Sequence, residues 1–328
     1  MNESIRLHDN APSFLSVERG PVFPLMIVPV QKDDEFISDF KDADKVTGAI
    51  HIWWIGQSGF LIKWDGYGLL IDPYLSDSVS RRYEGTDTPY TRISERVVDP
   101  LALEGIHYVV CTSTAPDRLD PETILPLRAA NPTLKLIVPA GEVATADAIL
   151  GAAAPPIIPV NAGTYAKSGP FDFHGINAAN PKIRRDELGN SKELGYVIMF
   201  GPFAIFHSGE TVWHTILIKE VRRWSVNLAF LPIDGADLPD RPRASMNGFE
   251  AAALSRGISA SLVIPCQYDL FEAGNPDNAE FSICCERLGQ RYRLLKLGQR
   301  MTMGPITDPT AGKALPSEPY SGDWRLGY

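Results

Sequence analysis

The chain has 328 residues, and its 44% hydrophobic and 22% charged residues are typical of an ordinary globular protein. A formal net charge of −9 argues against nucleic acid as a partner, because phosphate binding needs clustered cations. No run of about 18 apolar residues occurs, so the sequence predicts no membrane span.

The first part of the chain is expected to form an arm or cap over residues 1–48. Residues 1–20 show no clear period, and residues 21–30 contain three prolines, which favours an edge strand or an extended segment. Residues 33–44 are acidic, with apolar side chains spaced for one face of a short helix.

The core begins at Ala49 with three short strands. Residues 50–55 predict a buried strand, and a Gly-Gln-Ser-Gly turn leads to further strands at residues 60–64 and 68–71. The third strand ends in a polar loop that starts at Asp72.

Strands and helices alternate over the rest of the core. Further strands are predicted at residues 106–110, 135–139, 156–160, 171–179, 195–200, 203–206, 226–233 and 262–265. Helices are predicted at residues 122–130, 141–150, 246–256 and 277–288, with one more reaching residue 221. This alternation predicts two packed sheets with helices on both outer faces, an αββα sandwich in one domain over residues 49–304. Residues 305–328 are rich in Pro, Gly and Ser and predict an extended tail.

Two early motifs resemble those of a known family. The chain reads Trp-x-Gly-Gln-x-Gly-Phe from Trp54 and Asp-Pro-Tyr-Leu-Ser-Asp-Ser from Asp72. In order and spacing they are similar to the L-ascorbate-6-phosphate lactonase-like branch of the metallo-β-lactamase superfamily. The resemblance covers roughly residues 49–300 and implies an αββα sandwich of two mixed β-sheets, with the site at one edge.

The resemblance also implies a metal site, which in this family holds two zinc ions with five His and two Asp side chains. The corresponding positions in this chain are Ser113, Ala115, Asp117, Arg118, Asn180, Glu210 and Gln267. All five His are therefore replaced, although zinc prefers imidazole, thiolate and carboxylate ligands. We expect no metal, no cofactor and a catalytically degenerate homologue that keeps its ligand cleft.

Arg118 is the substitution with the clearest physical consequence. A guanidinium is permanently charged and cannot bind a cation, but it pairs well with carboxylates. We expect Arg118 to bridge to Asp117 or Glu210; the alternative, a solvated loop residue, stays open.

The predicted cleft is formed by the loops that carry these motifs. Its expected lining residues are Ser113, Ala115, Arg118, Asp120, Asn180, Gln267, Tyr268, Asp72 and Asn247. Asp117 and Glu210 are the candidate catalytic residues if the protein is an enzyme. The flanking thiols of Cys111 and Cys266 are predicted to be structural, and the expected ligand is small and anionic or sugar-like.

Three functions stay open at this stage. The first is the degenerate homologue with a binding cleft. The second is a hydrolase of lactones, esters or phosphorylated sugars that uses Asp117 or Glu210 as a general base on water. The third is a hydrolase in which these carboxylates hold a different metal. Relatives in this branch form homo-oligomers, which we expect here too. The polar first ten residues and the lack of a Cys-x-x-Cys pair predict a cytoplasmic protein.

Overall fold

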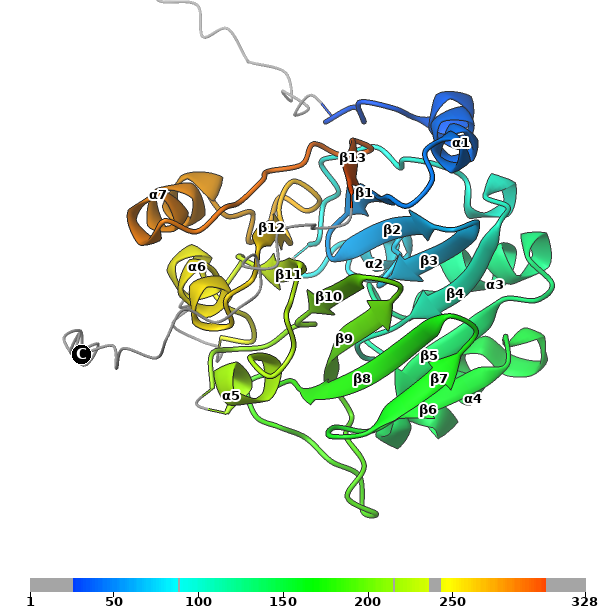
Figure 1. Cartoon of the computed structure of the whole chain (residues 1–328). Helices are drawn as coiled ribbons and strands as arrows, with labels where there is room; N and C mark the ends of the chain where they lie inside the picture. Colours follow the sequence, from blue (N-terminus) through cyan, green and yellow to red (C-terminus); the bar gives the residue numbers. More distant parts are fainter. Residues whose placement is uncertain (1–25, 88, 215, 236–242, 305–328) are drawn as a thin grey trace, which may run out of the picture.

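Two β-sheets pack face to face, and helices cover their outer faces (Figure 1). The computed structural model describes residues 26–304 apart from residues 88, 215 and 236–242. Residues 1–25 of the predicted arm and all of the predicted tail, residues 305–328, lie outside the described residues. The predicted αββα sandwich is confirmed.

The larger sheet has the strand order β13-β1-β2-β3-β4-β5-β6. Its strands β1 to β3 and β13 pair antiparallel, whereas β3 to β6 pair parallel, so the sheet is mixed. The strands are β1 (Ile50–Gly56), β2 (Gly59–Trp64), β3 (Tyr67–Ile71), β4 (Ile106–Val110), β5 (Lys135–Pro139), β6 (Ile157–Val160) and β13 (Arg300–Met303).

The smaller sheet has the order β12-β11-β10-β9-β8-β7 and is also mixed. Its strands β7 to β10 pair antiparallel, and β10 to β12 pair parallel. The strands are β7 (Tyr165–Ser168), β8 (Phe171–Asn177), β9 (Leu194–Phe200), β10 (Phe203–His207), β11 (Leu228–Pro232) and β12 (Leu262–Cys266).

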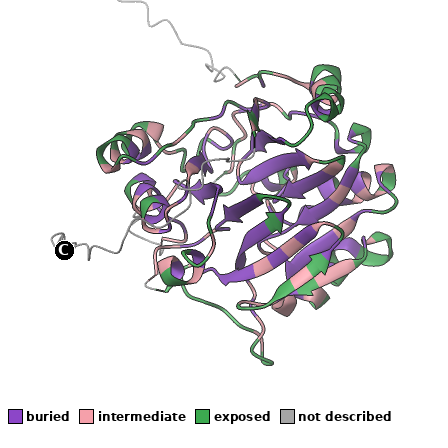
Figure 2. Cartoon of the chain, viewed as in Figure 1, coloured by how far each residue is buried: buried purple, intermediate pink, exposed green. Residues whose placement is uncertain are grey.

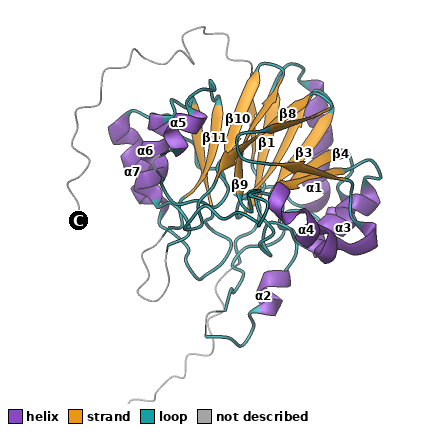
Figure 3. Ribbon diagram, turned by 90° about the horizontal axis from the view of Figure 1, so that it is seen from below, coloured by secondary structure: helices purple, strands orange, loops and turns teal. Residues whose placement is uncertain are grey.

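The helices form two groups, one on each side of the paired sheets, as Figure 3 shows from below. One group is α1 (Asp33–Asp42), α3 (Pro121–Ala130) and α4 (Val143–Leu150), and the other is α5 (Leu217–Val221), α6 (Gly248–Gly257) and α7 (Asn278–Leu288). The short α2 (Ser78–Arg82) lies among the loops beyond the sheet edge. Short 3-10 turns occupy Ala43–Lys45, Pro100–Ala102, Ala140–Glu142 and Gly151–Ala153. No helix in the described part of the chain is long and apolar enough to cross a bilayer.

The inner faces of the sheets are the main hydrophobic core, and the strands that form it are largely buried in Figure 2. Phe60 on β2 stacks on Phe230 on β11 with ring centroids 3.9 Å apart, so this pair joins the two sheets. Both side chains are fully buried, and burial of one such ring stabilises the fold by roughly 1.5–3 kcal/mol.

Four elements differ from those that the sequence predicts, and one of them is the short helix α2, which no sequence pattern indicated. The helix expected to reach residue 221 occupies only Leu217–Val221. Strands β7 and β13 were not predicted, because each has four residues and their burial shows no clean alternation. The Pro-rich segment before α1 contributes one bridge, between Ile27 and Ser94, which fits the expected extended conformation.

The ends of five strands meet at one edge of the sandwich. Strands β3 and β4 run parallel in one sheet, and β10, β11 and β12 run parallel in the other. Loops after the carboxyl ends of parallel strands are where α/β folds hold their binding sites. These loops contain the motif residues that the sequence singles out.

Candidate functional site

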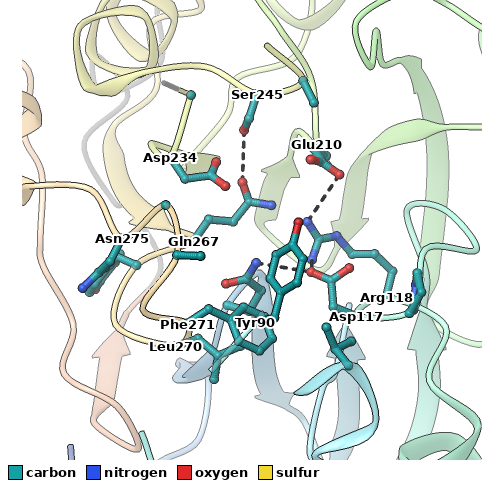
Figure 4. Close-up of a pocket in the computed structure, with 18 of the residues that line it drawn as sticks. Tyr90, Asp117, Arg118, Glu210, Asp234, Ser245, Gln267, Leu270, Phe271 and Asn275 are labelled. Carbon is teal, nitrogen blue, oxygen red and sulfur yellow. Dashed lines mark hydrogen bonds and ion pairs between the residues drawn. The ribbon is translucent and has the colours of Figure 1, made fainter. Parts of the chain in front are cut away.

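Arg118 lies at the centre of these loops, and its side chain is only 1% exposed. Its Nη1 donates a hydrogen bond to Asp117 Oδ2 at 2.6 Å. Its Nη2 lies 3.8 Å from Glu210 Oε2, and its Nε lies 3.5 Å from Asp72 Oδ2. The predicted pairing of Arg118 with Asp117 or Glu210 is therefore confirmed for both carboxylates (Figure 4). These carboxylates raise the guanidinium pKa further, although burial acts to lower it.

Asp72 forms the base of the site at the end of β3. Its carboxylate has no exposed surface and accepts hydrogen bonds from the backbone N and the Oγ1 of Thr112, at 2.7 and 2.6 Å. Burial raises the pKa of Asp72 to about 6, although Arg118 and Thr112 act to lower it. The residue ties the end of β3 to the loop that follows β4.

Gln267 follows β12 and connects Arg118 to a second group of polar side chains. Its amide oxygen faces Arg118 Nη2 and also accepts from Ser58 Oγ at 3.1 Å. Its amide nitrogen then donates to Ser245 Oγ at 3.0 Å and to Asp234 Oδ1 at 2.5 Å. The opposite orientation would place the amide oxygen against Asp234 and the amide nitrogen against Arg118, where neither could form a hydrogen bond.

Asp234 is a site residue that the sequence reasoning missed. It comes directly after the buried strand β11, and an acidic residue at such a strand end was a signal that could have found it. Burial raises the pKa of Asp234 to about 7, and the Glu210 carboxylate adds to this effect. Burial also raises the pKa of Glu210, against the opposing effect of Arg118.

A cavity of about 370 Å³ opens in front of these groups. Its polar side is formed by Asp117, Arg118, Glu210, Asp234 and Gln267, which Figure 4 shows around one space. Its opposite side is aromatic and includes Tyr83, Tyr90 and Phe271. A cavity with polar groups converging on one side and apolar groups on the other is typical of small-molecule sites.

Most of the other predicted cleft residues do not line this cavity. Tyr268 lines it, together with Asp117, Arg118, Glu210 and Gln267. Asp120 instead begins α3, where it accepts from the backbone N of Glu122. Asn247 begins α6 in a capping box with Glu250. The remaining predicted residues are not among the described lining residues of the cavity: Ser113, Ala115 and Asn180.

The histidine and the thiols nearest the site have structural surroundings. Burial lowers the pKa of His207 to about 3, so the ring is neutral. Its Nδ1 accepts from the backbone N of Gly209 at 3.0 Å, and its Nε2 therefore donates to Ser58 O at 3.0 Å. Cys111 and Cys266 are fully buried, and burial raises the pKa of each thiol. These surroundings fit the structural role expected for both cysteines.

The donors around the cavity do not fit the pair of zinc ions that the family resemblance implies. The guanidinium of Arg118 lies between Asp72, Asp117 and Glu210, and a permanent cation opposes a metal ion there. Within residues 26–304, leaving aside those not described, no group of three or more His, Cys, Asp or Glu side chains is placed to hold a metal ion.

Comparisons with known proteins agree with the fold. Residues 51–267 match the family model described as the beta-lactamase superfamily domain. A protein of Methanoculleus marisnigri named UPF0173 metal-dependent hydrolase is 32% identical over 114 residues, which are 34% of this chain and 47% of that protein. The chain therefore spans about half the length of this curated relative.

Two solved structures show the same fold at low sequence identity. Igni18, described as a novel metallo hydrolase from Ignicoccus hospitalis, is 20% identical with a TM-score of 0.57, covering 78% of this chain and 98% of that one. A possible metal-dependent hydrolase from Veillonella parvula is 14% identical with a TM-score of 0.62, covering 78% and 99%.

The loss of the five histidines predicts no cofactor, and these comparisons contradict that prediction. The curated relative and both solved structures are named as metallo or metal-dependent hydrolases, which implies a metal cofactor among proteins like this chain. The prediction considered mainly zinc, whereas carboxylate and amide oxygens suit harder ions. Missing imidazoles therefore do not exclude every metal.

Proposed function

Since the chain belongs to the beta-lactamase superfamily, we propose that the cavity beside Arg118 is a small-molecule binding cleft on that fold. One observation carries the proposal: a single buried guanidinium contacts three carboxylates, and two of these, Asp117 and Glu210, face the cavity. The protein would then be a catalytically degenerate homologue that binds a ligand at the position of the family's reaction site.

The energetics of the site support binding over a purely structural role. Replacing a buried ion cluster by well-packed apolar residues is often neutral or stabilising, so stability alone does not explain such a cluster. Here the cluster is fixed by Thr112 and Gln267 and opens onto a cavity. Side chains that are held in place before a ligand arrives lose little conformational freedom on binding.

A hydrolase is the second candidate, and the names of the curated relative and the solved structures favour it. Asp234 faces the cavity with a pKa raised by burial to about 7, which suits a general base or acid near neutral pH. Asp117 and Glu210 offer further carboxylates, either as bases or as oxygen ligands of a hard cation. Lactones, esters and phosphorylated sugars are the substrates to test.

Two measurements on the full chain separate these candidates. The first is the metal content of protein purified without chelator. The second is a screen of lactones, esters and sugar phosphates for hydrolysis, with Asp117→Asn and Glu210→Gln as controls. Ligand binding without turnover supports the degenerate homologue. Stoichiometric metal together with hydrolysis that a chelator abolishes supports the metal-dependent hydrolase and overturns the first proposal.

The predicted ligand class and assembly stay predictions. Sugar phosphates in the screen test whether the cleft takes a small anionic or sugar-like ligand. Light scattering of the purified chain tests whether it forms a homo-oligomer.

A further inference from the structure

We propose that the cleft binds a small organic cation, with its ammonium group held between the carboxylates and the aromatic side chains of the cavity. This inference rests on the proposed function and names the chemical class of the ligand. It stands on three features: the charge balance of the cavity, the way its two arginines are paired, and the arrangement of its rings.

Among the residues that the structure describes, negative charge exceeds positive charge around the cavity. The lining contains the carboxylates of Asp117, Glu210 and Asp234 and the guanidiniums of Arg118 and Arg243. Each arginine also pairs with a further carboxylate that does not line the cavity, Asp72 for Arg118 and Glu250 for Arg243. Five carboxylates therefore share two guanidiniums, so the described groups carry a surplus of negative charge when ionised.

The positive charges of the two arginines are already engaged. Arg118 is buried among three carboxylates, and Arg243 Nη2 lies 2.8 Å from Glu250 Oε1. Glu210, by contrast, is 26% exposed, and its ion pair with Arg118 is 3.8 Å long, beyond hydrogen-bond distance. Its carboxylate is therefore available to a ligand. Burial raises the pKa values of both Glu210 and Asp234; Arg118 acts to lower that of Glu210, and the Glu210 carboxylate raises that of Asp234 further.

The aromatic side of the cavity complements a cation. The rings of Tyr83 and Tyr90 have centroids 5.1 Å apart at 58°, and those of Tyr90 and Phe271 are 5.5 Å apart at 80°. In Figure 4 the hydroxyl end of Tyr90 points toward the polar side, where Arg118 and Glu210 lie. All three residues line the cavity, and the face of an aromatic ring attracts an ammonium group placed over it.

Other ligand classes fit these features less well. An anion would meet the carboxylates of Asp117, Glu210 and Asp234, and the guanidinium beside them already donates to Asp117 and to Gln267. A hard metal ion takes about six or more oxygen ligands, and the aromatic side of the cavity offers few. An ammonium group needs only a nearby carboxylate and an apolar or aromatic surface.

The test compares choline with 3,3-dimethylbutan-1-ol, its uncharged carbon analogue of nearly the same shape. Dissociation constants for the full chain are measured by titration calorimetry and NMR. We expect choline to bind about tenfold more tightly than the neutral analogue, and the difference to shrink at high salt. Inorganic phosphate and magnesium chloride are titrated in parallel.

Variants assign the effect to the cleft. Glu210→Gln and Asp117→Asn keep the side-chain shape and should weaken choline binding several-fold while leaving the neutral analogue unchanged. Tyr90→Leu should weaken choline binding as well. Asp147→Asn removes one exposed carboxylate on α4 and should change nothing.

The outcomes separate this inference from the proposed function. Equal binding of choline and its neutral analogue overturns the inference alone, as does tighter binding of phosphate, because a ligand cleft remains. Stoichiometric magnesium binding that Asp117→Asn abolishes assigns the surplus charge to a metal and also overturns it. If neither these probes nor the substrate screen detects binding, both proposals fail.

Discussion

The carboxylate of Asp72 and the guanidinium of Arg118 meet at the base of the cleft, with Oδ2 and Nε 3.5 Å apart and almost no solvent access to either side chain. Asp72 comes from the end of β3, and Arg118 from the loop after β4. Their contact therefore holds together two neighbouring loops that build the site. It also makes each residue depend on the other, because a buried charge without a partner is strongly unfavourable.

Replacing Arg118 by Met should destabilise the protein strongly. The substitution removes the cation from three carboxylates, and breaking a buried ion pair from one side costs roughly 3–5 kcal/mol. Urea denaturation of the variant and of the wild type measures the difference in unfolding free energy.

Arg81→Met is the matched control, because it breaks an ion pair with Glu122 in which both side chains are about half exposed. Surface pairs contribute little, so this variant should unfold close to the wild type. A loss for Arg118→Met no larger than that for Arg81→Met would contradict a central role for the buried guanidinium.

The stability of the protein should depend on the ionisation of Asp234. Its pKa is raised from 3.8 to about 7 on folding, so between about pH 4 and pH 7 the folded state binds more protons than the unfolded state. The contribution of Asp234 to the unfolding free energy must then fall as the pH rises through this range. The raised pKa values of Asp72 and Glu210 act in the same direction, whereas the lowered pKa of His207 acts in the opposite one.

Asp234→Asn should flatten this part of the pH profile. The variant keeps an acceptor for Ser245 and Gln267 but no longer titrates, so its stability relative to the wild type should improve as the pH rises from 4 to 8. Urea denaturation at a series of pH values measures both profiles, with Asp147→Asn as the control. Parallel profiles for Asp234→Asn and the wild type would show that this group keeps an ordinary pKa.

Asn247 should act through helix α6 and not through ligand binding. Its side chain accepts from the backbone N of Glu250 at 2.9 Å, and the Glu250 carboxylate accepts from the backbone N of Asn247 at 3.3 Å. Asn247→Ala should therefore cost about 1 kcal/mol in thermal or urea unfolding, whereas Asn247→Ser keeps the cap and most of the stability. A loss of ligand binding in Asn247→Ser at unchanged stability would instead place the residue in the cleft.

The four cysteines should react in two classes. Cys284 is partly exposed, whereas Cys111, Cys266 and Cys285 are fully buried with pKa values raised by burial. Alkylation of native protein followed by mass spectrometry should therefore modify Cys284 first and the three buried thiols only as the chain unfolds. Rapid native labelling of Cys111 or Cys266 would reopen the possibility of a nucleophilic thiol.

Much of the architecture could be predicted from local patterns. In residues 50–55, polar and apolar side chains do not alternate, and nearly all are apolar. This pattern is typical of a strand covered on both faces, and these residues form most of β1. The pairing of Arg118 was also predictable, because the motif placed a permanent cation beside Asp117. A buried guanidinium is strongly unfavourable unless carboxylates pair with it, so burial of Arg118 implied such partners.

Other parts of the site depend on tertiary contacts that no local pattern reveals. The position of Asp234 depends on Gln267, which follows β12, and on Ser245, which lies later in the segment between β11 and α6. The aromatic side of the cavity joins Tyr83 and Tyr90 to Phe271, which is about 180 residues away along the chain. Asn247 looked like a cleft residue because it lies in a motif-rich region, but its side chain is used by its own helix.

The walls of the cavity come from different sheets. Asp117 and Arg118 follow β4 of the larger sheet, whereas Glu210, Asp234 and Gln267 follow strands of the smaller one. The spacing of the opposed groups is therefore set by how the two layers are stacked, and the Phe60–Phe230 contact is part of that stacking. A substitution that changes the side-chain volume at Phe60 or Phe230 should therefore change ligand affinity, although neither residue lines the cavity.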